Sequence, residues 1–161
     1  MKHKEADTMK KLSGNTIVNI VAAVLLLISL IIVQISFKTA QGWFDTGNNE
    51  IIIVLAVLGI AFFLAIVVLN ITGAGAESKG VSLLKMFLSA GACACAGVVF
   101  GLVLGAIATE FAYTFLSDFN KGTAKANFMP AACKQAAAGM VLSVAAIIAA
   151  AAANAFNEQK R

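Results

Sequence analysis

Charged residues divide the chain into four long apolar windows. No Asp, Glu, Lys or Arg occurs within residues 12–37, 51–76, 86–109 and 135–157, which are 26, 26, 24 and 23 residues long. A helix needs about 20 apolar residues to cross a bilayer. Each window is therefore long enough to cross once and too short to cross twice. The windows lack the alternating polarity of barrel strands, so they predict four membrane-spanning helices.

The windows and their polar flanks predict where the elements begin and end. We expect one transmembrane domain at 16–156 between polar tails at 1–15 and 157–161, with helices at about 16–37, 51–72, 82–117 and 131–156. The fold class is then an all-α membrane protein, a four-helix transmembrane bundle with short loops. Pro130 is expected in the first turn of the last helix, where its missing N–H is harmless. Trp43 and Phe44 are expected to anchor the first loop at the membrane interface, with ligand stacking as the alternative.

The amino-acid composition also indicates that lipid surrounds part of the protein. Hydrophobic residues make up 60% of the 161 and charged residues only 12%, against roughly 45–50% and about 25% in soluble domains. The basic residues divide unequally between the two predicted sides, eight on the side of the termini and four on the other. The positive-inside rule therefore predicts both termini in the cytoplasm and a multi-pass protein of the cell membrane. The net charge of +4 includes no basic cluster interleaved with aromatics, so no nucleic-acid partner is expected.

Small residues recur at helical spacing in the third and fourth windows. Gly97, Gly101 and Gly105 form a row in the third, and Gly139 and Ser143 belong to a similar series in the alanine-rich fourth. Small side chains let two helix backbones approach closely in a membrane. Two interpretations of the glycine row remain open, namely packing within the bundle and a face for another subunit or a partner protein.

Glu110 is the one acidic side chain on the apolar side of the aromatic residues that end the third helix. At 100° per residue it lies about 180° from Gly101 and about 140° from Gly105, above Ala92, Ala96, Val99, Val103 and Ala106. One interpretation is an interfacial carboxylate paired with Lys134. The other is a cation or proton site that opens to the outside, because acids within spanning helices are costly and often functional.

Residues for catalysis or metal binding are scarce. The single histidine is His3, in the polar tail, and no serine or cysteine has a base nearby in sequence. Cys93 and Cys95 lie at a different predicted depth from Cys133, which excludes a disulfide between them within one subunit. We expect all three to be small packing residues, with an intermolecular bridge at Cys133 as the alternative. No enzymatic activity, metal or cofactor is expected.

Two functional hypotheses follow. The first is a non-enzymatic membrane protein that acts through helix packing, either as a homo-oligomer or as an accessory subunit of a membrane complex. The second is a small transporter or channel for ions or small solutes, with Glu110 and polar groups such as Gln34 along its path. The lipid bilayer is the partner common to both hypotheses.

Overall fold

Four helices account for most of the described chain. The computed structural model describes residues 14–41, 44, 48–72, 79–112, 114 and 124–158, and in the last range it describes the side chains of 127–152. The helices are α2 (Gly14–Thr39), α3 (Asn49–Ile71), α4 (Lys79–Phe111) and α5 (Ala124–Glu158). All four are long and apolar enough to cross a membrane, as the charge-free windows predict.

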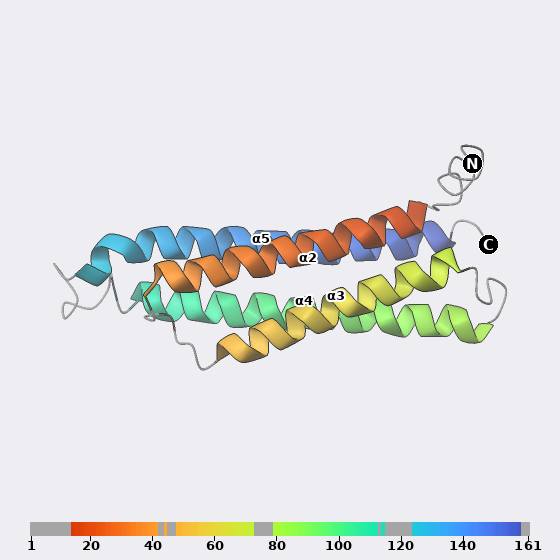
Figure 1. The fold of residues 1–161 in the computed structure, drawn as a ribbon, viewed down its shortest axis with the longest axis horizontal. Coiled ribbons are helices and arrows are strands. Elements are labelled where there is room, and N and C mark those ends of the chain that lie inside the picture. The colour runs from red at the N-terminus through yellow and green to blue at the C-terminus, as the bar shows by residue number, and fades with distance from the viewer. Residues whose placement is uncertain are drawn as a thin grey trace, which may run out of the picture.

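The helices run antiparallel to their chain neighbours along one common axis (Figure 1). α2 packs most extensively against α5 and also against α3, while α4 packs against both α3 and α5. The order around the bundle is therefore α2, α3, α4, α5. The start of α2 and the end of α5 lie at one end of the bundle, here named the Gly14 end, and the opposite end is named the Thr39 end.

The buried residues of the bundle follow a heptad pattern. On α2 and α5 they recur at alternating spacings of three and four residues, which is the a and d pattern of helices that supercoil around one another. The series on α2 is Asn15, Asn19, Ala22, Leu26, Ser29, Val33 and Ser36, continued by Ala40 just after the helix, and that on α5 is Met129, Ala132, Ala136, Gly139, Ser143, Ala146 and Ala150. Because most of these side chains are small, the two helices lie close together.

The start of α5 differs from the prediction. The helix begins at Ala124, so Pro130 lies inside it rather than in its first turn. The residues before Pro130 include two alanines, which favour a helix, and the buried Met129, which packs into the core. This packing outweighs the loss of one backbone hydrogen bond at the proline.

Phe44 also differs from the prediction. It is 1% exposed and belongs to the hydrophobic core at the Thr39 end, so its assignment as an interfacial anchor is wrong. Its ring meets that of Phe37 edge to face, with centroids 5.3 Å apart and planes at 64°. α3 begins only at Asn49, and the aromatic pair contributes to the core just before α3 starts. Trp43 lies outside the described residues.

Candidate functional site

The glycine row of α4 faces away from the bundle. Gly101 and Gly105 are exposed and Gly97 is half-buried. A Cβ atom added at any of the three would meet no atom within 4 Å. The described chain thus contains nothing that packs closely on this row, and the predicted packing within the bundle does not occur there. The alternative, a face for another subunit or a partner protein, stays a prediction.

The opposite face of α4 is the one that enters the core. Ala92, Ala96, Val99 and Val103 are buried there. Glu110 continues this face and is itself 7% exposed. The helical geometry therefore predicts correctly that the acid and the glycines lie on different faces of α4.

Gly139 lies at a close contact between α5 and α2. A Cβ atom there would stand 2.7 Å from Cγ2 of Val33 and 3.0 Å from the carbonyl oxygen of Ser29. The hydroxyl of Ser29 donates a hydrogen bond of 2.6 Å to the carbonyl oxygen of Gly139, across the two helices. Ser143, one turn further along α5, is fully buried and donates to the carbonyl oxygen of Met140 in its own helix.

Two further glycines make close contacts that the sequence analysis missed. A Cβ atom at Gly59 of α3 would lie 2.9 Å from Cδ2 of Leu26 and 3.3 Å from Cβ of Cys95. At Gly91 of α4 it would lie 2.9 Å from the ring of Phe62. The signal available for Gly59 is its heptad spacing from the buried residues Ile52, Ala56 and Phe63.

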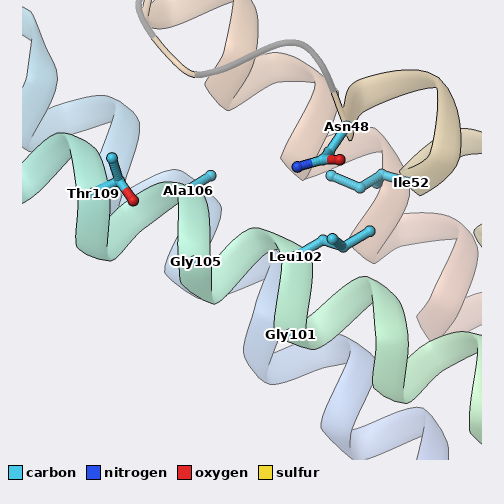
Figure 2. A pocket seen from close by; sticks show the side chains of 7 residues that line it. All are labelled: Asn48, Ile52, Gly101, Leu102, Gly105, Ala106 and Thr109. Carbon is cyan, nitrogen blue, oxygen red and sulfur yellow. The ribbon is translucent and has the colours of Figure 1, made fainter.

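A groove runs beside the glycine row, between α4 and the start of α3 (Figure 2). Its volume is about 250 Å³. In Figure 2, Asn48 and Ile52 from the start of α3 stand across from Leu102, Ala106 and Thr109 of α4. The groove is lined by Asn48, Ile52, Gly101, Leu102, Gly105, Ala106 and Thr109. Gly101 and Gly105 of the glycine row thus form part of one wall of the groove. The groove leaves part of α4 uncovered by α3 in this region.

Glu110 lies at the contact of α4 with α5. Its carboxylate is close enough to the Cys133 thiol of α5 to act on it electrostatically. Glu110 is buried, whereas Lys134, the next residue along α5, is exposed. Glu110 is thus enclosed by the bundle, whereas its depth in a membrane and its pairing with Lys134 stay predictions.

Thr114 is a buried polar group that the sequence analysis did not single out. It follows Glu110 by four residues, is 2% exposed, and its hydroxyl oxygen has no hydrogen-bond partner among the described residues. Ala112 and Thr114 belong to a wider, π-type turn that follows α4. Such turns occur often at functional sites, but the helical pattern of α4 alone does not predict one here.

Gln34 joins two helices instead of facing an open path. Its side-chain amide donates a hydrogen bond of 2.8 Å to Oδ1 of Asn49, which connects the last part of α2 to the start of α3. At the other end of α2, the amide of Asn19 donates to the backbone oxygen of Asn15 at 2.8 Å. These buried amides find protein partners, as expected of polar groups in lipid.

The cysteines are free, and Cys95 and Cys133 are buried. Among the described residues, no three His, Cys, Asp or Glu side chains converge as metal ligands would. His3 lies outside the described part of the chain. No protein-family model, curated protein or solved structure matches the chain.

Proposed function

We propose that this chain is a non-enzymatic integral membrane protein that acts through helix packing, as a homo-oligomer or as an accessory subunit of a membrane complex. The observation that carries the proposal is the uncovered glycine row of α4. In the described chain, Gly59, Gly91 and Gly139 each stand against a neighbouring helix, whereas a Cβ atom added at Gly97, Gly101 or Gly105 would meet no atom within 4 Å.

The exposed face of α4 repeats the pattern of the buried seams. Ala90, Ala94 and Ala108 are exposed and extend the glycine row in both directions at spacings of three and four residues. Lipid chains are as apolar as leucine side chains, so helices in a membrane associate through close backbone contact rather than through hydrophobicity. A second helix placed on this face would therefore gain contacts that lipid provides less well.

The proposed location is the cell membrane with both termini in the cytoplasm. Four crossings bring the two ends of the bundle domain to the same side, and the start of α2 and the end of α5 share one end of the bundle. Lys79 and Lys85, at the start of α4, add to the positive charge at that end. This arrangement follows the positive-inside rule.

Replacement of Gly101 by leucine tests the packing proposal. We expect Gly101→Leu to weaken self-association or partner retention at least about tenfold, or about 1.4 kcal/mol, because the side chain would hold the second backbone away. Native mass analysis of the protein purified in mild detergent measures this.

The matched control is Ala138→Leu, which places the same leucine side chain at an exposed position of α5. It should leave the assembly unchanged. An assembly that is equally stable in Gly101→Leu and the wild type would contradict the proposal.

A second candidate function is a small transporter or channel for ions or small solutes. The observation that favours it is the burial of Glu110 inside the bundle rather than at its surface. A buried carboxylate is costly in a membrane and commonly marks the path of an ion or proton. The candidate therefore depends on Glu110 itself.

The flux of cations or protons into proteoliposomes tests this candidate. Glu110→Gln should abolish the flux, because it removes the charge and preserves the shape. Glu50→Gln, at an exposed position in the first turn of α3, should leave the flux unchanged. Normal flux in Glu110→Gln would remove this residue from the mechanism.

A further inference from the structure

The first ten residues of α4 project from the bundle at the Gly14 end. None of residues 79–88 is buried, and Ser89 is the first buried residue of the helix. α4 is 33 residues long, or about 50 Å, whereas the hydrocarbon of a bilayer is about 30 Å thick. Figure 1 shows the start of α4 extending beyond the start of α2. The first turns of α4 are therefore open to whatever surrounds the protein at this end.

Two lysines lie in this segment. Lys79 is exposed and Lys85 is half-buried, and neither forms an ion pair with a described residue. The charge-free window 86–109 begins directly after Lys85, so Lys85 marks the edge of the hydrocarbon and Lys79 lies about 9 Å further along the helix. The headgroup layer of one leaflet is about 5–8 Å thick. Both ammonium groups therefore reach the level of the lipid phosphates, since lysine side chains extend toward polar surroundings.

The charges of the whole chain are divided unequally between the two ends of the bundle. Residues 1–13, 72–85 and 157–161 flank the helix ends at the Gly14 end, and they contain eight basic and four acidic residues. Residues 38–50 and 110–134, at the other end, contain four of each. The whole net charge of +4 therefore belongs to the Gly14 end. Such a charge attracts the anionic lipids of the adjacent leaflet.

Apolar side chains continue from Lys79 toward the hydrocarbon. Leu83, Met86 and Phe87 are 52%, 56% and 63% exposed. At 100° per residue all three lie within about 80° of Lys79. One face of α4 thus has a cation at its outer end and apolar side chains further in. A phospholipid has the matching order of groups, with its phosphate outermost and its acyl chains inside.

We propose that this face of α4 binds an anionic phospholipid, with the headgroup phosphate at Lys79 and an acyl chain along Leu83, Met86 and Phe87. Lys85 and the net charge of the Gly14 end strengthen the attraction. The inference rests on the proposed membrane location. It depends neither on the orientation of the bundle nor on what covers the glycine row.

Lipid titration of the purified full chain in mild detergent, followed by native mass analysis, tests the site. Phosphatidylglycerol is compared with phosphatidylcholine of the same acyl chains. We expect the Kd for phosphatidylglycerol to be at least about fivefold lower, and to rise with the concentration of ammonium acetate, because salt screens exposed charges. Equal Kd values for the two lipids would overturn the proposal and would leave the two lysines for an acidic segment of a partner protein.

Removal of one cation identifies the contact. Lys79→Gln should raise the Kd for phosphatidylglycerol about fivefold. Lys38→Gln is the matched control, because Lys38 is also exposed but lies in the last turn of α2, at the end where basic and acidic residues are equal in number. It should bind the lipid like the wild type. Equal losses in the two variants would show a general attraction between cations and lipid, and would overturn the site.

A soluble phosphate distinguishes a lipid site from a simple anion site. sn-Glycerol 3-phosphate has the phosphate but no acyl chains, so at the concentrations of the lipid it should not displace phosphatidylglycerol. Displacement would assign Lys79 to a soluble phosphate and overturn the lipid proposal. The same spectra report the oligomeric state, so a failure of this site is distinguished from a failure of the packing proposal.

Discussion

Gly139 determines how closely α5 approaches α2. The missing Cβ atom leaves room for Val33, and the proximity allows the Ser29 hydroxyl to reach the carbonyl oxygen of Gly139 at 2.6 Å. Gly97, by contrast, has open space where a Cβ atom would be. The same residue type therefore serves two different purposes in this chain, and only the neighbours distinguish them.

The two glycines predict opposite effects of the same substitution. Gly139→Ala should destabilise the folded protein by about 1–3 kcal/mol, because the methyl group would overpack the contact with α2. Gly97→Ala should instead stabilise the folded protein by about 0.5–1 kcal/mol, because the methyl group meets open space and alanine has the higher helix propensity. Unfolding in mixed micelles measures both, and equal losses in the two variants would contradict the assignment of Gly139 as the packing residue.

At the scale of elements, one residue between α2 and α3 is part of the core. Phe44 comes after the end of α2 and before the start of α3, and it is only 1% exposed. Its ring contacts Phe37 near the end of α2. Phe44 therefore helps to hold the end of α2 in place.

Removal of the Phe44 ring tests this role. Phe44→Ala should cost about 3–5 kcal/mol of stability, as expected for a large aromatic side chain lost from a core. Phe111→Ala is the control, because Phe111 is 49% exposed and its ring adds little to the core. Thermal unfolding in detergent provides the comparison, and a Phe44→Ala variant no less stable than Phe111→Ala would contradict the core assignment.

At the scale of the whole molecule, an even number of crossings constrains the topology. If all four helices cross, both ends of the bundle domain lie on one side of the membrane, and the distribution of lysine and arginine predicts that side to be the cytoplasm. The two ends of the chain then share an environment with the start of α4, where Lys79 and Lys85 lie.

A fluorescent-protein fusion that matures only in the cytoplasm tests this orientation. A fusion after Arg161 should be fluorescent, because it follows four crossings. The matched fusion after Asn120 should be dark, since it follows three crossings and places the reporter outside. The reverse pattern would show that the bundle is inserted with the opposite orientation.

Three features were determined by the sequence alone. Charge-free windows of sufficient length led to the four helices, because an isolated charge in hydrocarbon is too costly to place at random. The spacing of small residues in 131–156 placed Gly139 and Ser143 on one face, where the structure has both residues buried. The angle between Gly101 and Glu110 separated the glycine row from the acid on α4. These three features depend only on the length of each apolar window and on the helical spacing of residues within it.

Only the tertiary structure decided which of these faces is covered. In lipid the outward and inward faces of a helix are both apolar, so polarity does not mark the core as it does in water. The row at Gly101 and the seam at Gly139 look alike in sequence, yet one is exposed and the other is packed. The burial of Phe44 and Glu110 and the position of Pro130 inside α5 likewise depend on which helices become neighbours. Those neighbours are chosen by contacts between residues far apart in the chain, which no local pattern records.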